Sequence, residues 1–205
     1  MREGRRMKEE QTLRDPVLLD LPEQLETRRL VLRPPAPGDG PMMNEAVLET
    51  IEALQRWMPW AVPTPTMEQS ELYCRKSAAE WIERKHFALL LFSRDEPGVL
   101  VGSSAMKVID WNVPRFEIGY WVRRRFEGQG YVTEAARAIA RFAFETLAAK
   151  RVEIRTDDRN ERSWRVAERL GFRLEGVLRN ESREAAGLRD TGIYAVTNLA
   201  QLREM

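Results

Sequence analysis

The stretch Phe116–Ala135, with the sequence FEIGYWVRRRFEGQGYVTEA, decides how this 205-residue chain folds. Its first seven residues alternate in the manner of a β-strand and are mainly aromatic or β-branched. The chain then turns through Gly128 and Gly130, and from Val132 the apolar residues recur at helical spacing. A strand, a glycine turn and a helix in this order predict an anion site, because the first helical turn leaves N–H groups unpaired and glycine lets the backbone approach a phosphate.

The composition indicates one globular domain with a substantial core. Hydrophobic residues make up 43% and charged residues 32% of the chain, and the net charge of +1 argues against a stable nucleic-acid binder. With one cysteine, Cys74, and one histidine, His86, we expect no disulfide framework, no metal site and no histidine-based triad. The chain has no apolar run long enough for a membrane span and no apolar signal core near Met1, so a cytoplasmic protein is expected.

The patterning predicts the element order β-αα-βββ-α-β-α-ββ. The expected strands are 29–33, 87–92, 99–109, 116–122, 151–156, 172–178 and 192–197, and the expected helices are 39–54, 66–85, 132–147 and 163–170. Thr66 is the expected N-cap of the second helix. This order predicts an α+β fold, with a mixed, mostly antiparallel twisted sheet of about seven strands and helices on both faces. Residues 1–24 are expected to form a partly mobile extension, and residues 25–205 a single domain.

The turn RFEGQG, from Arg125 to Gly130, resembles the R/Q-x-x-G-x-G/A signature of the GCN5-related N-acetyltransferases, the GNAT superfamily. A turn of this kind alone would also suit a strand-to-helix connection without a ligand. The resemblance extends to residues 25–34, the NERS motif from Asn160 to Ser163, and the segments 170–172 and 175–179. It is closest to the RimJ/RimL branch, whose members acetylate protein N-termini such as those of ribosomal proteins. The lead-in before residue 25 departs from the compact family pattern.

The resemblance implies acetyl-CoA as co-substrate and no metal. The loop would hold the pyrophosphate, the backbone of residues 121–123 would pair with the pantetheine arm, and the N–H of Val122 would face the thioester oxygen. Arg123 and Arg125 would contact phosphates, or belong to a solvated charge run. The full set implied for the cofactor is Trp121, Val122, Arg123, Arg125, Gly128, Gln129, Gly130, Tyr131, Val132, Asn160 and Ser163.

Two residues are expected to take part in catalysis: Glu117 as a base and, as the resemblance implies, Ser163 as the acid for the departing thiolate. A weak base and a weak acid would be sufficient, because an α-amine has a pKa near ~8 and a thiol a pKa near ~8.5. Each residue has a structural alternative: Glu117 could pair with an arginine, and Asn160 or Ser163 could simply cap a helix. His86 is expected to be structural, and Cys74 to lie in the core or to be partly exposed.

The expected function is transfer of an acetyl group to a primary amine by direct attack in a ternary complex. Trp57, Trp60 and Tyr73 fall in the region that lines the acceptor cleft in this fold, or they belong to the core. The resemblance favours the α-amine of a protein or peptide N-terminus, and Trp57 and Trp60 favour a more apolar acceptor or an extended peptide. The acidic residues Glu45, Glu49, Glu52, Glu68 and Glu71 leave a polyamine or aminoglycoside open. The alternatives are therefore a small-molecule amine acceptor or a non-catalytic acyl-CoA binder. A homodimer is possible.

Overall fold

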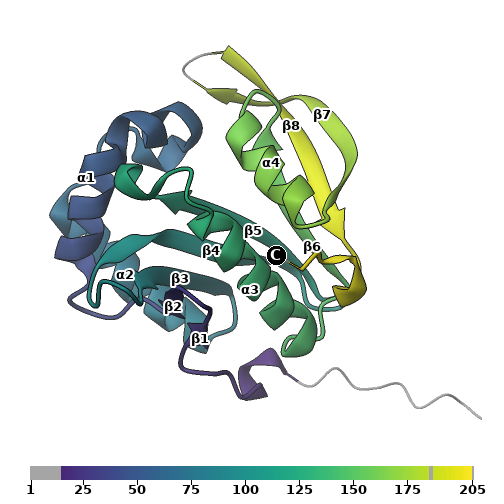
Figure 1. Cartoon of the computed structure of the whole chain (residues 1–205), viewed down its shortest axis with the longest axis horizontal. Coiled ribbons are helices and arrows are strands. Elements are labelled where there is room, and N and C mark those ends of the chain that lie inside the picture. The colour runs from purple at the N-terminus through teal and green to yellow at the C-terminus, as the bar shows by residue number, and fades with distance from the viewer. Residues whose placement is uncertain (1–14, 185–186, 205) are drawn as a thin grey trace, which may run out of the picture.

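The strand at the start of the Phe116–Ala135 stretch, β5 (Arg115–Val122), lies in the middle of a mixed sheet (Figure 1). The computed structural model describes residues 15–184 and 187–204, and within them the sheet has eight strands in the order β1-β2-β3-β4-β5-β6-β8-β7. The other strands are β1 (Leu25–Glu26), β2 (Leu30–Arg33), β3 (His86–Ser93), β4 (Leu100–Asp110), β6 (Arg151–Asp157), β7 (Arg173–Glu184) and β8 (Gly187–Val196). Seven of these correspond to predicted strands, and the two-residue β1 is the addition.

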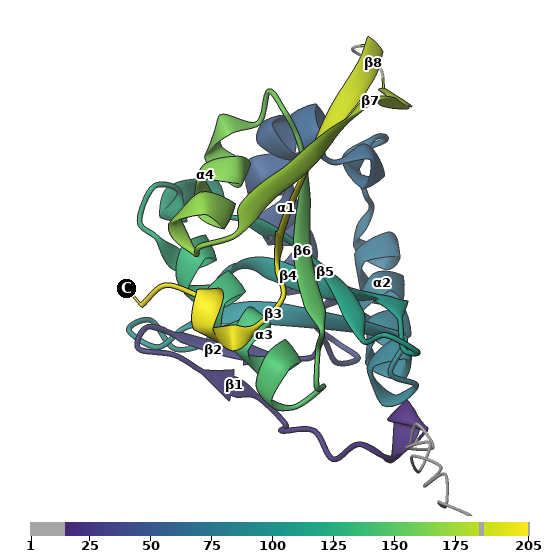
Figure 2. The ribbon, with the colours of Figure 1, turned by 90° about the vertical axis from the view of Figure 1, so that its right-hand side faces the viewer.

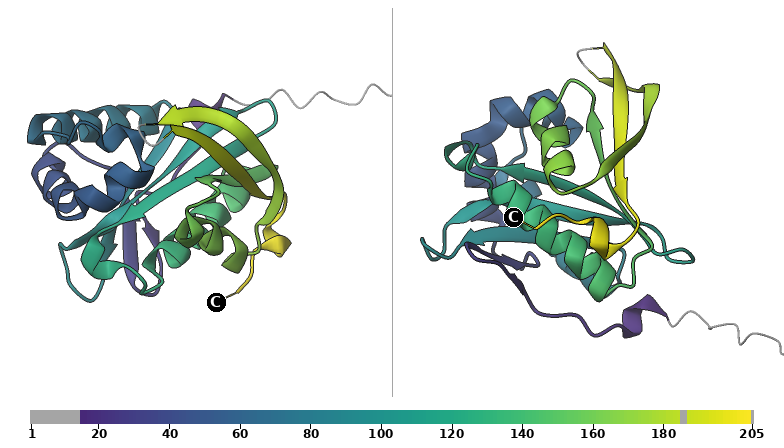
Figure 3. Two further views of the ribbon diagram at one scale, coloured as in Figure 1. Left: turned by 90° about the horizontal axis from the view of Figure 1, so that it is seen from above. Right: turned by 45° about the vertical axis from the view of Figure 1, so that its right-hand side comes forward.

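The helices cover both faces of this sheet, as predicted. They are α1 (Gly40–Trp57), α2 (Met67–Ile82), α3 (Tyr131–Glu145) and α4 (Glu161–Arg169). Figures 2 and 3 show α1 and α2 over one face and α3 and α4 over the other. Strand alternation explains the two layers: Phe116 and Ile118 belong to the core cluster that contains the α3 residues, whereas Trp121 packs against the cluster beneath α1 and α2.

The β7–β8 hairpin is longer than the sequence predicts. Strands were expected at 172–178 and 192–197, but pairing continues outward to the pairs Ser182↔Arg189 and Arg183↔Leu188. The prediction was too short because the outer half of the hairpin is mostly polar and carries no alternating apolar pattern. Ion pairs hold this part instead, including Arg179 to Asp190 at 2.6 Å. Residues 185 and 186, in the predicted turn, lie outside the described residues.

The strands β5 and β6 separate along their length. They pair in parallel only from Arg115↔Arg151 to Glu117↔Glu153, whereas β5 remains paired with β4 as far as Val122. The N–H of Arg123 donates to the carbonyl oxygen of Val101 at 2.8 Å. Because hydrogen-bonding direction alternates along a strand, the backbone groups of Tyr120 and Val122 must turn the other way, toward the gap beside β6.

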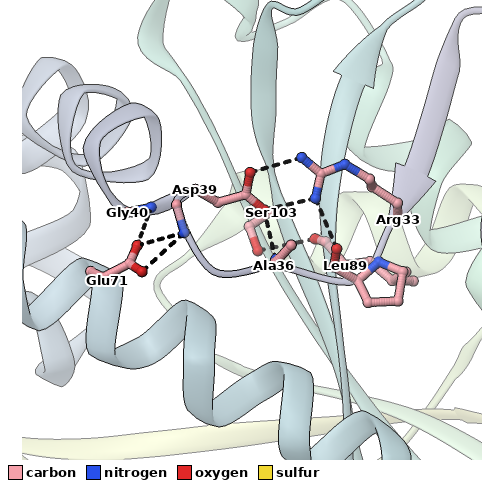
Figure 4. A network of polar contacts seen from close by, with 9 residues as sticks. Arg33, Ala36, Asp39, Gly40, Glu71, Leu89 and Ser103 are labelled. Atoms are coloured by element: carbon pink, nitrogen blue, oxygen red, sulfur yellow. Dashed lines mark hydrogen bonds and ion pairs between the residues drawn. The ribbon is translucent and has the colours of Figure 1, made fainter.

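A polar network fixes the start of α1 against α2 (Figure 4). Arg33 holds Asp39 through two hydrogen bonds of 2.7 and 2.8 Å, and the carboxylate of Glu71 accepts from the N–H groups of Gly38 and Gly40 at 2.9 and 3.0 Å. A Cβ at Gly40 would lie 2.5 Å from the Cα of Glu71, so only glycine permits this approach of the two helices.

Thr66 caps α2 as predicted. Its side chain accepts from the N–H of Gln69 at 3.2 Å, and the Gln69 side chain accepts from the N–H of Thr66 at 2.8 Å. This reciprocal capping box fixes where the helix begins.

Part of the predicted N-terminal extension packs on the domain. Leu19 and Leu21 contact the core that contains α3, and the Arg84 side chain donates to the carbonyl oxygen of Leu19 at 2.6 Å. Residues 1–14 of the extension lie outside the described residues. None of the helices found in the described ranges has the length and apolar character needed to cross a membrane.

Candidate active site

The turn that leads into α3 has two residues with positive φ, a backbone conformation that favours glycine. Gly128 has φ of 73° and Gly130 has φ of 82°, both in the left-handed region. Gly130 is the N-cap of α3 and supplies no side-chain cap, so the helix begins with N–H groups that no capping side chain satisfies. A Cβ at Gly128 would meet no atom within 4 Å, which leaves the space above this backbone open. The arrangement suits a bound anion.

This turn forms one wall of a cavity of about 620 Å³, here named the loop cavity. Its other walls are the end of β5, the helix α4 and part of α1. It brings together most of the predicted cofactor residues, namely Trp121, Val122, Gly128, Gly130, Tyr131, Val132, Asn160 and Ser163. Trp57, predicted on the acceptor side, also lines this cavity.

Three arginines of α4, at positions 162, 165 and 169, also line the loop cavity, and sequence reasoning missed them. The signal was present: Arg162 lies within the Asn160–Ser163 motif, and Arg165 and Arg169 follow it at spacings that share one helix face. Arg162 pairs with Glu127 and Arg165 pairs with Glu161, while Arg169 donates to the Thr133 hydroxyl at 3.3 Å. Three guanidinium groups therefore line the same cavity as the open helix start, two of them paired with carboxylates.

Arg123 does not line the loop cavity, and its predicted contact with the cofactor stays a prediction. Its side chain is 7% exposed and forms ion pairs with Glu49 and, at 2.9 Å, with Glu45, both on α1. Its N–H pairs with β4, so neither its guanidinium nor its N–H is directed to the gap between β5 and β6. Strand alternation explains this placement: the side chains of residues 121 and 123 point toward α1, and their backbone groups point toward β4. Trp121 accordingly meets the loop cavity through its side chain.

Arg125 and Gln129 are not among the residues that line the loop cavity. The guanidinium of Arg125 lies 4.7 Å from the centre of the Phe126 ring. The Gln129 side chain donates to the carbonyl oxygen of Arg125 at 2.8 Å, so it braces the turn from within. Their contact with a phosphate stays a prediction.

Asn160, Ser163 and Tyr120 form one hydrogen-bonded group in the loop cavity. Asn160 accepts from the N–H of Ser163 at 3.3 Å, which is the capping role that the sequence left open. The Tyr120 hydroxyl lies 3.0 Å from the carbonyl oxygen and 3.2 Å from the hydroxyl of Ser163. Burial raises the pKa of Tyr120 well above its ordinary value, so the phenol keeps its proton at neutral pH. Sequence reasoning gave Tyr120 no role in the site, because only the fold brings it to α4.

A second cavity, of about 550 Å³, lies between the sheet and the pair α1–α2; it is named the sheet cavity. Trp60 and Tyr73, both predicted to contact the acceptor, are in its wall together with Trp121. The rings of Trp60 and Trp121 are 6.5 Å apart. Met58, Tyr120 and Trp121 line both cavities, so the two spaces meet at the end of β5.

Glu117 lies outside both cavities. It borders a separate open pocket lined also by Pro59, Arg155, Glu181, Ser182, Arg183 and Arg189. Burial raises the pKa of Glu117, although Arg155 and Lys107 act in the opposite direction. Gly119, two residues along the same face, lies in the sheet cavity. The role of Glu117 as a base therefore stays a prediction, and it requires a water molecule to carry the proton from the amine to the carboxylate.

Most of the acidic residues that left a polycationic acceptor open are paired elsewhere. Glu45 and Glu49 hold Arg123, Glu52 pairs with Arg124 at 3.7 Å, and Glu71 holds the start of α1. The exposed Glu68 is not among the residues that line the sheet cavity.

Cys74 is buried, and burial raises its pKa to about 11, which removes it from thiolate chemistry at neutral pH. His86 lines the sheet cavity, with Nδ1 3.3 Å from a carboxylate oxygen of Glu80. Among the described residues, no cluster of His, Cys, Asp and Glu has the makings of a metal site.

Comparisons with known proteins fit this geometry. The model of the family described as "Acetyltransferase (GNAT) domain" matches residues 29–173. The Bacillus subtilis (strain 168) protein named "Putative ribosomal N-acetyltransferase YdaF" is 32% identical over 149 residues, which cover 70% of this chain and 78% of that protein. The Escherichia coli (strain K12) "Ribosomal-protein-serine acetyltransferase" is 28% identical over 143 residues, or 68% of this chain and 78% of the relative.

A solved structure described as RimL, a ribosomal L7/L12 alpha-N-protein acetyltransferase in complex with coenzyme A, superposes with a TM-score of 0.81 at 22% identity. It covers 87% of this chain and 99% of its own.

Proposed function

Because this chain belongs to the GNAT family of acetyltransferases and resembles its RimJ/RimL branch, we propose that it transfers the acetyl group of acetyl-CoA to the α-amine of a protein or peptide N-terminus. The observation that carries the proposal is the junction of the two cavities at Tyr120 and Trp121. One cavity ends in a glycine turn and a helix start, and the other has an apolar wall. A thioester and an amine can meet there from opposite sides.

The loop cavity fits coenzyme A by the chemistry of its lining. The pyrophosphate would lie against the open N–H groups at the start of α3, where Gly128 leaves room for it. Arg162, Arg165 and Arg169 add positive charge from α4. The backbone of Tyr120 and Val122 faces the gap between β5 and β6, where an extended arm would pair with it as an added strand.

Direct transfer is the simplest chemistry that these groups support. The neutral amine would attack the thioester carbonyl carbon, the C–S bond would break, and coenzyme A would leave as the thiolate. The Val122 N–H would stabilise the charge on the carbonyl oxygen, an interaction worth about 3 kcal/mol in comparable sites. Tyr120 or Ser163 would return a proton to the sulfur, and Glu117 would accept the amine proton through water.

The lining of the sheet cavity favours a peptide over a polycation. Its residues are aromatic, aliphatic or neutral polar, whereas several positive charges would require acidic partners. The relatives named for ribosomal proteins point the same way. A small apolar amine is the second candidate, since about 550 Å³ lies within the ~300–1,000 Å³ that hold drug-sized ligands.

The test is a comparison of acceptors. Calorimetry with acetyl-CoA establishes binding, and thiol release is then followed with short peptides, spermidine, an aminoglycoside and free amino acids. Selective turnover of peptides supports the proposal. Turnover of a small amine with every peptide inert would replace the acceptor, and binding without any turnover would favour a non-catalytic acyl-CoA binder.

A further inference from the structure

The floor of the sheet cavity is made by an unusual pair of small residues. Ala105 on β4 and Gly119 on β5 are direct partners in the ladder and both line the cavity. The pairs on either side of them on the same face, Ser103↔Trp121 and Lys107↔Glu117, carry larger side chains. A Cβ added at Gly119 would meet no atom within 4 Å. The floor of the cavity is therefore low at this pair, because neither residue carries a side chain that extends beyond Cβ.

The walls around this hollow are apolar or neutral. Trp60, Tyr73 and Trp121 supply aromatic surface, and Met43 and Val47 supply aliphatic surface from α1. Among the described residues that line the cavity there is no aspartate, glutamate, lysine or arginine. At its edge, burial lowers the pKa of His86, which favours the neutral imidazole. A charged group placed here would lose its hydration without gaining a partner of opposite charge.

We propose that the sheet cavity holds a bulky, uncharged side chain next to the accepting amine, such as that of an N-terminal leucine, methionine or phenylalanine. This inference rests on the proposed function and names its substrate class. A large apolar side chain would contact more of the aromatic wall in this cavity of about 550 Å³ than serine or alanine would. The expected preference in kcat/KM is roughly 10- to 100-fold, as for hydrophobic pockets that discriminate by size.

The first experiment measures kcat/KM for peptides that differ only in residue one: Leu, Met or Phe, against Ser or Ala, against Lys or Glu. Phenethylamine and spermidine serve as small amines with and without an apolar body. Preference for Leu, Met and Phe supports the inference, and equal or better turnover of Ser and Ala overturns it while peptide acetylation stands. Turnover of phenethylamine alone supports the cavity assignment but overturns the peptide acceptor. Failure of every amine overturns both.

The second experiment fills the hollow. Gly119→Val should lower kcat/KM for the Leu peptide at least tenfold, should lower that for the Ser peptide clearly less, and should leave the acetyl-CoA Kd within about threefold. Gly176→Val is the matched control, because Gly176 also lies in a strand with no atom within 4 Å of its added Cβ and does not line the cavity. Equal losses for both peptides would overturn the inference. Ala105→Val tests the same floor from β4 if Gly119→Val folds poorly.

Discussion

At the scale of single residues, Gly128 combines a left-handed backbone with open space above it. Gly128→Val should weaken acetyl-CoA binding at least tenfold, because its side chain enters the loop cavity. It should also cost about 1–2 kcal/mol of stability, because φ is positive. Gly128→Asn should keep more stability, since asparagine tolerates this conformation. Calorimetry and urea unfolding measure the two effects.

Gly98→Val separates binding from backbone strain. Gly98 has φ of 83° and open space around its added Cβ, and it does not line the loop cavity. Gly98→Val should lose about as much stability as Gly128→Val, but its Kd for acetyl-CoA should be unchanged. Wild-type affinity in Gly128→Val would remove the pyrophosphate assignment.

Replacing Glu117 by glutamine should lower turnover but raise thermal stability at neutral pH. The raised pKa of Glu117 means that activity needing the carboxylate declines, as pH falls, at a higher pH than for an ordinary glutamate. Glu117→Gln should lower turnover at neutral pH, with partial recovery at higher pH as the amine loses its proton unaided. A variant with the wild-type pH–rate profile would take the base role from Glu117.

The same shift makes Glu117 unfavourable for stability. A folded-state pKa above the unfolded value means that the folded protein binds more protons between the two, so its contribution to stability falls as pH rises through that interval. Glu117→Gln should therefore unfold at a slightly higher temperature than wild type at pH 7, and the difference should vanish below pH 4.5. A lower melting temperature at pH 7 would contradict this.

The Tyr120 and Ser163 hydroxyls are predicted to act as one unit. Tyr120→Phe should lower kcat about tenfold, equivalent to 1.4 kcal/mol, because a thiolate needs little help to leave. Ser163→Ala should have a milder effect, and the double variant should lose no more than Tyr120→Phe alone. Turnover at saturating acetyl-CoA measures all three, and strictly additive losses would show two independent groups.

At the scale of elements, Arg123 ties the end of β5 to α1. Arg123→Met leaves Glu45 and Glu49 without this partner and should cost about 1–3 kcal/mol in urea unfolding. The control is its neighbour Arg124, whose pair with Glu52 is exposed on both sides, so Arg124→Met should change stability by less than about 0.5 kcal/mol. Equal costs would mean that the buried Arg123 guanidinium does not hold the two elements together.

The elements were largely predictable where local chemistry determines them. Thr66 and Gln69 form a capping box whose residues are close in sequence, and the glycine turn is read from six consecutive residues. The direction of the Arg123 side chain could not be predicted, because it depends on strand register, which no local pattern reveals. The outer β7–β8 hairpin was missed because its pairing is through the backbone and through arginine–carboxylate contacts between polar residues. Tyr120 meets Ser163 across 43 positions of the chain, a contact that only the assembled sheet creates.

At the scale of the whole molecule, the sheet separates two spaces and lets them meet at one strand end. The loop cavity lies toward α3 and α4, and the sheet cavity lies under α1 and α2. This arrangement favours direct transfer with both substrates bound together over a covalent acetyl-enzyme intermediate. The buried Cys74 is not placed to carry the acetyl group.

The separation of β5 from β6 should be visible in amide hydrogen exchange across the free molecule. The amides of Trp121 and Arg123 face β4 and should exchange slowly, whereas those of Tyr120 and Val122 face the gap and should exchange quickly. One strand would thus show an alternating fast and slow pattern, which NMR resolves residue by residue. Acetyl-CoA should slow the two fast amides and leave their neighbours unchanged. A pattern that stays alternating in saturating acetyl-CoA would show that the ligand does not complete the sheet, so this strand reports occupancy without any assay of turnover.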